Sequence, residues 1–478
     1  MRETADKTFV AIFEILSASL RSSMRAALLL AVYFGLAKLL LQFALTLWTT
    51  HLGYGYFRDE FYFLACGRHL AWGYVDQGPI VALQARLTTF LFGDSIFGIR
   101  VTSAFAGSCT VALGGLLTWA LGGGRSAQAL AMLGLIIVPV YLAVDGFLSI
   151  TSPEPVFWMG CILALVLMQR GAPAAACWLA VGLLAGVGLL NKPSMVFFLV
   201  ALIFGLLLTP ERRLLHTPWF AAATFLTLLM VSPFLLWQVH NGWPTWEFLQ
   251  NAKAGKDTIL GPLPFLWAQI AQMHPANALL WVTGLVTVLR GRLLPGFRWI
   301  GVTFLIFLAV MFALHAKDYY LAPVYPMLFA AGAAAWEKRF PDAPRVMNGS
   351  LIAFPLFESV LMITGLMILP LASPVLRPSA WVRYTRVLHL APTESETIRT
   401  STLPQFYADR FGWNQLASIV VGGYRSLPLT EREHVCIFAN NYGEARGCYG
   451  LVTIGGSLLP FVWLSAWRDG QGREGLPV

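Results

Sequence analysis

The chain has 478 residues, of which 57% are hydrophobic and only 12% are charged, and its mean hydropathy is +0.66. Soluble proteins carry about 25% charged residues, so this chain has too little polar surface to cover a globule in water. The composition therefore predicts a polytopic membrane protein and excludes a cytosolic enzyme, a secreted disulfide scaffold and a disordered chain. In such a protein the net charge of +9 reflects membrane sidedness, and we expect no nucleic-acid partner.

Eleven apolar runs are candidates for membrane-spanning helices, because a hydrocarbon core about 30 Å thick needs about 20 mostly apolar residues. They lie near 25–48, 97–121, 127–144, 154–169, 174–191, 193–209, 218–238, 264–289, 299–315, 319–336 and 350–373. The first run is long, and no small-residue cleavage site follows it, so we interpret it as an uncleaved helix. The sequence predicts an α-helical polytopic membrane protein with about 11 transmembrane helices.

The basic residues predict the orientation of these helices. With the N-terminus in the cytoplasm, the inner segments contain Arg2, Lys7, Arg21, Arg25, Arg125, Arg170, Arg212, Arg213, Arg290, Arg292, Arg298, Lys338, Arg339 and Arg345. The short outer loops contain only Lys192, Lys253, Lys256 and Lys317. Because Lys and Arg are enriched in short cytoplasmic loops, we expect an inner N-terminus and, with an odd number of helices, an outer C-terminal segment.

Two outer segments are long. Segment 49–96 is not apolar enough to span, and its aromatic residues among charges predict short helices that lie in the membrane interface. Segment 374–478 has the composition of a soluble protein and predicts a small extracytoplasmic domain of mixed α/β character. We therefore divide the chain into a transmembrane domain, 1–373, and a C-terminal domain, 374–478. Whether Cys436 and Cys448 form a disulfide in that domain stays open.

Ionisable residues gather in the predicted outer loops. They are Arg58, Asp59, Glu60, Asp76, Asp145, Glu154, Lys192, His240, His315, Lys317 and Asp318. Charged groups are costly near the membrane plane and usually have a functional reason to be there. Six loops that converge on one face indicate an active site open to the outside, not a channel lined from end to end.

The acidic residues allow two interpretations. Asp59 and Glu60, beside Arg58 and among aromatic residues, suit a general base or a divalent-cation site, but Asp before a helical run is also an ordinary N-cap. Asp145 and Glu154 bracket the next acidic outer loop, where a helix start also accounts for Glu154.

The basic residues suit an anion. Lys192 stands alone between two apolar runs, where it either binds a phosphate or extends to the lipid headgroups. The stretch from His315 through Lys317 to Tyr319 and Tyr320 suits a phosphate or pyrophosphate head, or forms an interfacial aromatic belt. The sequence has no Walker loop, no GxGxxG after a strand and no HExxH, so nucleotide-driven transport and zinc proteolysis have no support.

Several stretches, taken in order, resemble the GT-C superfamily of membrane glycosyltransferases, in the branch of protein O-mannosyltransferases and aminoarabinose transferases (glycosyltransferase family 39 and relatives, bacterial subgroup). They are Phe57-Arg58-Asp59-Glu60-Phe61-Tyr62, Gly73-Tyr74-Val75-Asp76-Gln77-Gly78-Pro79, Thr151-Ser152-Pro153-Glu154-Pro155, Leu190-Asn191-Lys192, Lys317-Asp318-Tyr319-Tyr320-Leu321-Ala322-Pro323-Val324-Tyr325-Pro326, Gln405-Phe406-Tyr407-Ala408-Asp409 and Asn441-Tyr442-Gly443-Glu444-Ala445. Two departures are Gln77-Gly78-Pro79, where the family usually has a Pro-Pro context, and the tail after Cys448, which fits the family poorly.

The resemblance implies specific roles. It places the catalytic base on Asp59, with Glu60 beside it, and a second acidic residue at Glu154. It implies that Lys192 contacts the donor phosphate, that the junction from His315 to Tyr320 lies on the donor side, and that the protein resides in the bacterial cytoplasmic membrane.

The activity expected from these roles is inverting transfer of a sugar from a polyprenyl phosphate to a hydroxyl acceptor on a protein, lipid or glycan. The outer face holds no nucleotide sugar, so the donor must be lipid-linked. The alternatives are a lipid-linked-saccharide flippase and a non-catalytic envelope scaffold. The sequence names no cofactor, and a role for a divalent cation stays open.

Overall fold

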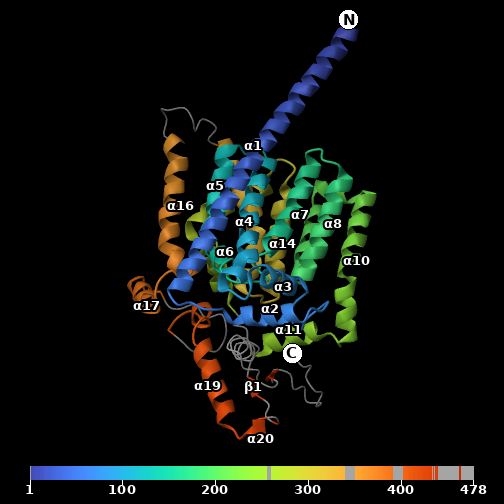
Figure 1. Cartoon of the computed structure of the whole chain (residues 1–478). Helices are drawn as coiled ribbons and strands as arrows, with labels where there is room; N and C mark the ends of the chain where they lie inside the picture. The colour runs from blue at the N-terminus through green and yellow to red at the C-terminus, as the bar shows by residue number, and fades with distance from the viewer. Residues whose placement is uncertain are drawn as a thin grey trace.

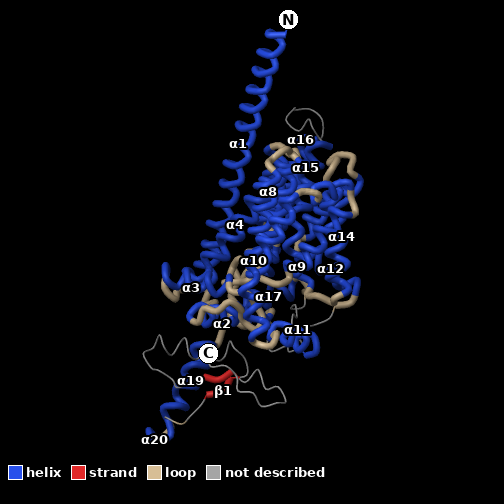
Figure 2. Tube along the Cα trace, turned by 90° about the vertical axis from the view of Figure 1, so that its right-hand side faces the viewer, coloured by secondary structure: helices blue, strands red, loops and turns tan. Residues whose placement is uncertain are grey.

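The computed structural model describes residues 2–255, 260–339, 350–390, 402–432, 434, 437–439 and 462–464. Almost all of this part of the chain is helical, and its long helices run side by side in one bundle (Figure 1). The first helix, α1 (Arg2–His51), extends well beyond the bundle at its N-terminal end, as both views show (Figures 1 and 2). The predicted helical membrane architecture is therefore present.

The other helices of the bundle follow in chain order. They are α4 (Ile96–Ala120), α5 (Arg125–Ile136), α6 (Pro139–Val144), α7 (Glu154–Gln169), α8 (Ala174–Asn191), α9 (Met195–Leu207), α10 (Pro218–His240), α12 (Pro262–Gln272), α13 (Ala278–Arg290), α14 (Arg298–Ala313), α15 (Tyr325–Arg339) and α16 (Ser350–Ala372). Within the described residues, five segments are long and apolar enough to cross a membrane: Ser22–His51, Ile96–Ala120, Ala174–Asn191, Pro218–His240 and Pro355–Ala372. The total of 11 spans remains a prediction.

Two of the predicted runs are interrupted helices. The run near 127–144 is split into α5 and α6, and Pro139 is the first residue of α6. The run near 264–289 is split into α12 and α13 by a short 3₁₀ turn, η2 (Pro275–Asn277). A proline has no N–H to continue the helical ladder, so each break falls where a proline would otherwise lie in a helix interior. The side chain of Asn277 donates to the Gly134 carbonyl at 3.0 Å and so joins the two broken runs.

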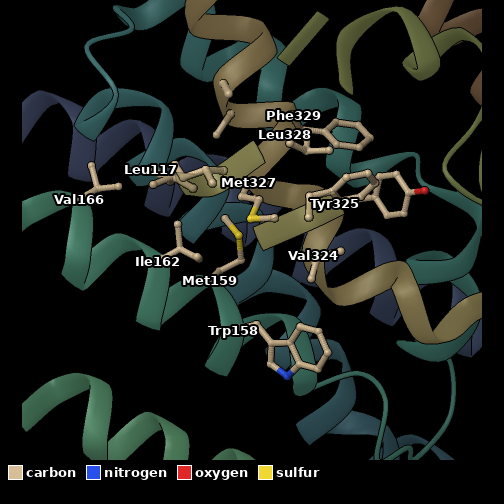
Figure 3. Close-up of a cluster of buried hydrophobic side chains, with 14 of the residues drawn as sticks. Leu117, Trp158, Met159, Ile162, Val166, Val324, Tyr325, Met327, Leu328 and Phe329 are labelled. Atoms are coloured by element: carbon tan, nitrogen blue, oxygen red, sulfur yellow. The ribbon is translucent and has the colours of Figure 1, made fainter. Parts of the chain in front are cut away.

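Helix α15 lies at the centre of the bundle, with every residue from Tyr325 to Ala335 buried. Small residues let its neighbours approach closely: a Cβ added at Gly332 would lie 2.0 Å from the Leu280 carbonyl oxygen of α13. Larger side chains from α4, α7 and α15 fill the surrounding core, including Leu117, Trp158 and Phe329 (Figure 3). Close packing of this kind, rather than hydrophobic exclusion, holds helices together in lipid.

The loops with the basic residues meet at one end of the bundle. The Arg170 guanidinium donates to the Trp119 carbonyl at 3.2 Å, and the Lys338 ammonium donates to the carbonyls of Leu121 and Leu293 at 3.5 and 3.3 Å. The opposite end carries three short helices, α2 (Arg58–Arg68), α3 (Ile80–Phe92) and α11 (Pro244–Gly255) (Figure 1). The structure thus contains the short helices expected in 49–96 and groups the loops as the predicted sidedness requires.

The C-terminal segment continues at the end that carries α2. Its described elements are α17 (Pro378–Val387), α18 (Gln405–Ala408), α19 (Trp413–Ser426), α20 (Leu429–Arg432), β1 (Ile437–Ala439) and β2 (Val462–Leu464), and the two strands pair in parallel. Buried Trp381 and Tyr407 pack against Tyr54 beyond the end of α1. The predicted α/β character is not established by these elements; Cys436, Cys448 and the motif at 441–445 lie outside the described residues.

The orientation can be tested by labelling engineered cysteines in a cysteine-free background. We chose two exposed positions at opposite ends of the bundle, Arg213 and Asn241. An impermeant maleimide applied to intact cells is expected to label Asn241→Cys and to reach Arg213→Cys only after the membrane is opened. The reverse pattern would contradict the predicted topology.

Candidate active site

A buried ion pair joins two of the predicted outer loops. Lys192 follows the end of α8, where Pro193 stops the helix, and Glu154 is the first residue of α7. The Lys192 ammonium lies 2.8 Å from Oε2 of Glu154, and the Ser194 hydroxyl donates to Oε1 at 2.7 Å. The two charged side chains are only 10% and 4% exposed. A carboxylate in the first turn of a helix is also favoured by the helix dipole, so Glu154 is held from both sides.

Two tyrosines complete this cluster. They belong to η3 (Asp318–Val324), the 3₁₀ helix between α14 and α15. The Lys192 ammonium lies 4.5 Å from the ring centre of Tyr320 and 5.6 Å from that of Tyr319, both within cation–π range. The structure therefore brings together Glu154, Lys192, Tyr319 and Tyr320, which the sequence places in three separate loops.

Asp59 lies next to this cluster on α2. Its carboxylate, like those of Glu154 and Asp318, lies close enough to the Tyr319 phenol to act on it electrostatically. Asp59 is 31% exposed, and Nε of Arg58 lies 3.3 Å from its Oδ1. Nη1 of the same guanidinium lies 3.4 Å from Oδ2 of Asp409, at the end of α18. Arg58 therefore lies between Asp59 and the C-terminal segment, and its expected role at the donor phosphate stays a prediction.

Glu60 has a different environment from Asp59. Its carboxylate is fully buried and forms a two-pronged pair with Arg100 of α4, with both N–O distances at 2.8 Å. It also accepts the backbone N–H groups of Phe57 at 2.7 Å and Leu148 at 2.9 Å. Through these contacts Glu60 anchors α2 to α4 and to the 145–154 loop, and its expected place in a base or cation site with Asp59 stays a prediction.

Asp145 is likewise turned away from the cluster. It caps α6, is 2% exposed, and lies 3.0 Å from the ammonium of Lys38 in α1. Asp145 was predicted with Glu154 as an acidic site residue, and its partner Lys38 was not among the predicted residues. A single lysine inside an otherwise apolar run was the signal that a buried partner must exist.

The remaining predicted residues lie at the edge of the cluster. His315 is exposed beyond the end of α14, with a left-handed φ of 50°. Lys317 caps η3 and is half-buried, close enough to the neighbouring Asp318 to interact with its charge. Among the described residues, no group of three His, Cys, Asp or Glu side chains is placed to hold a metal ion.

Comparison with known proteins gives a family match over part of the chain and a similar fold. Residues 76–237 match the family described as dolichyl-phosphate-mannose-protein mannosyltransferase. The fold is similar to ArnT from Cupriavidus metallidurans bound to undecaprenyl phosphate, with a TM-score of 0.55 and 15% identity over 88% of this chain and 89% of that one. The family match covers less than half of the chain, and the likeness to ArnT shows a similar fold.

Two more solved structures have a similar fold. The apo state of the same ArnT gives a TM-score of 0.53 and 16% identity, over 85% of this chain and 82% of that one. The oligosaccharyltransferase from Archaeoglobus fulgidus, tethered to an acceptor peptide, gives 0.52 and 12% identity, over 87% of this chain and 63% of that one. No curated protein matches the chain.

The family match covers only part of the candidate site. It contains Glu154 and Lys192, and it ends before the tyrosines of η3. Asp59 lies ahead of the matched residues, so its place beside the cluster comes from the three-dimensional arrangement alone. The sequence motifs and the fold therefore identify the same end of the bundle from independent observations.

The anchoring role of Glu60 predicts a loss of stability. Glu60→Gln leaves the Arg100 guanidinium buried without its carboxylate, which typically costs about 3–5 kcal/mol. We expect a clearly lower Tm for the detergent-solubilised protein, and recovery of much of that loss in Glu60→Gln/Arg100→Met, which removes both charges. An unchanged Tm with activity abolished would return Glu60 to the chemical site.

Proposed function

We propose that this protein is a GT-C-type glycosyltransferase that transfers a sugar from a polyprenyl-phosphate-linked donor to a hydroxyl acceptor at the outer face of the cytoplasmic membrane, with inversion at the anomeric carbon. The observation that carries the proposal is the buried Lys192–Glu154 pair under Tyr319 and Tyr320, with Asp59 beside it. The family match and the similarity to a structure that contains undecaprenyl phosphate support a lipid-linked donor.

The donor phosphate is assigned to Lys192. Its ammonium has three N–H donors, of which one serves Glu154 and a longer contact of 3.4 Å reaches the hydroxyl of Thr151. Both tyrosine rings lie within cation–π range of the ammonium, so a phosphate oxygen that reaches its third N–H meets a partly desolvated cation. Glu154 already neutralises the charge of Lys192. We therefore assign Lys317, which precedes η3, as a second cation that stabilises the phosphate.

The donor's polyprenyl tail is assigned to an apolar groove of about 350 Å³. The groove lies between α3, α4 and α7, and its lining includes Leu87, Leu91, Phe105, Cys109, Val156 and Phe157. Pro153, which also lines it, directly precedes Glu154. A lipid tail in this groove would therefore end beside the proposed phosphate site.

The chemistry needs one base. Asp59 accepts the proton of the acceptor hydroxyl, whose oxygen forms a bond to the anomeric carbon as the bond from that carbon to the phosphate oxygen breaks. The electron pair of the broken bond leaves with the phosphate, where Lys192 and Lys317 stabilise the added charge. A phosphate leaving group needs little protonation, so the carboxylate pair of a glycosidase is not required.

The test uses the full chain in liposomes with a radiolabelled polyprenyl phosphate sugar and a panel of protein, lipid and glycan acceptors. Transfer of label to one acceptor class supports the proposal. Movement of the labelled lipid across the bilayer without transfer would instead make the protein a flippase. If the protein shows neither transfer nor lipid movement, the scaffold hypothesis remains. EDTA added to an active sample decides whether a divalent cation takes part.

A further inference from the structure

A lysine lies deep inside the first helix of the bundle. Lys38 stands 13 residues before the end of α1 at His51, in a segment apolar enough to span a membrane. That separation is roughly 20 Å of helix. Its side chain is 1% exposed, so it does not extend to the headgroups. A cation at such a depth costs several kcal/mol unless it has a partner, and intramembrane charges usually serve a function.

The partner of Lys38 occupies space made by a missing side chain. Asp145, 2% exposed, places Oδ2 3.0 Å from the Lys38 ammonium. A Cβ at Gly107 of α4 would lie 2.1 Å from the same oxygen, so only glycine leaves room for the carboxylate there. The Ser152 hydroxyl donates to the other oxygen, Oδ1, at 2.6 Å. The pair therefore holds both the start of the 145–154 loop and a residue near its end.

From Asp145 the loop leads through buried hydrogen bonds to the proposed phosphate site. The Ser149 N–H donates to the Ser103 hydroxyl at 3.1 Å, and the Thr151 N–H donates to the Ser149 hydroxyl at 3.0 Å. The Thr151 hydroxyl in turn lies 3.4 Å from the Lys192 ammonium.

The last turn of α8 is tied to the same loop. The side chain of Asn191, the residue before Lys192, donates to the Ile150 carbonyl at 2.8 Å. The 145–154 loop is thus fixed to α1 at one end and to the Lys192–Glu154 pair at the other.

We propose that Lys38 is a positioning residue of the transfer site, which holds the 145–154 loop so that Glu154 and Thr151 meet Lys192. The proposal rests on the proposed function. Lys38 touches neither donor nor acceptor; it acts through Asp145 and Ser152. Loss of the pair should let the loop relax and misplace the Lys192 ammonium, with the rest of the bundle intact.

The test variant removes both charges together. Lys38→Met alone would leave a buried carboxylate unpaired and risks misfolding, whereas Lys38→Met/Asp145→Asn leaves no charge behind and keeps both volumes. We expect this double variant to fold with a Tm close to wild type and to lose at least tenfold in kcat. Ser152→Ala, which breaks the link between Asp145 and the loop end, should lower kcat in the same direction.

The matched control is Ser108→Ala. The Ser108 hydroxyl donates to the Gly35 carbonyl at 2.7 Å, so it also links α4 to α1, but it does not touch the loop. Ser108→Ala should lose about as much stability as Ser152→Ala, because each removes one buried hydroxyl donor, but its kcat should stay within about twofold of wild type. A purely structural role for Lys38 predicts that control and test variants lose activity only as far as they lose stability.

A double-mutant cycle separates positioning from general damage. In a Glu154→Gln background, Lys38→Met/Asp145→Asn should lower kcat by less than twofold, because the group it positions is already removed. Full activity in the double variant or in Ser152→Ala, or additive losses in the Glu154→Gln background, would overturn the proposal. Absence of sugar transfer by the wild-type chain would instead overturn the proposed function.

Discussion

Asp59→Asn is expected to lower sugar transfer by about 10²–10⁴-fold while binding of the lipid-linked donor survives. The amide keeps the size of the carboxylate and can still accept a hydrogen bond from Arg58, but it cannot take the proton of the acceptor hydroxyl. The measurement is initial transfer rate at saturating donor and acceptor, with donor binding followed separately by the labelled lipid.

A control for Asp59→Asn is available in the same outer segment. Asp94 is 33% exposed and pairs with Arg68 at 3.2 Å, so Asp94→Asn makes the same chemical change at similar exposure and also breaks an arginine contact. Asp94→Asn should stay within about twofold of wild type. A fully active Asp59→Asn variant would remove the catalytic assignment and favour the flippase hypothesis.

The sequence predicted the bundle because its signal is local. Runs such as 97–121 and 174–191 are apolar over their whole length, and each corresponds to one helix, α4 and α8. The breaks between α5 and α6 and between α12 and α13 were not predicted. A proline inside an apolar run is compatible with a kink, a break or a continuous helix in lipid, and contacts between distant segments, such as that from Asn277 to Gly134, determine the outcome.

The candidate residues of the site could be named from the sequence, but the contacts between them could not. Lys192 was expected at the donor phosphate and Glu154 as a second acidic residue, and the structure shows that the two form an ion pair. Asp59 and Glu60 look equivalent in sequence, yet the first contacts Arg58 and is partly exposed while the second is buried against Arg100, because successive side chains of α2 point in different directions. Partners such as Arg100 and Lys38 lie on other helices, and no spacing rule on a single chain connects them.

The C-terminal segment shows the same limitation. Composition separates 374–478 from the bundle, but it gives no sign that Asp409 reaches Arg58 or that the Gly55 N–H donates to the Arg410 carbonyl at 3.1 Å. Burial and the nearby Arg100 lower the pKa of the Arg410 guanidinium to about 10, so it stays charged at neutral pH behind the outer loop. Asp409 and Arg410 therefore support the start of α2, where Asp59 lies.

The second large effect is expected at Lys192. Removing its ammonium takes away a charge-assisted contact to the donor phosphate worth about 1.5–3 kcal/mol, so Lys192→Ala should lower kcat/KM by roughly tenfold or more. Because Lys192→Ala also leaves Glu154 buried without its cation, the decisive variant is Lys192→Gln. Its amide can still donate to Glu154, which preserves the pair's hydrogen bond while the positive charge is lost.

The two roles of Lys192 predict different results for Lys192→Gln. If the lysine serves the donor phosphate, this variant should keep a Tm near that of wild type and still lose about tenfold in kcat/KM, with the loss shared by every acceptor. Lys338→Ala is the control: this ammonium donates to the carbonyls of Leu121 and Leu293 at the opposite end of the bundle, so transfer should stay within about twofold. If the role of Lys192 is confined to neutralising Glu154, Lys192→Gln should retain nearly full activity, and the phosphate would have to be bound by Lys317 or another cation at this face.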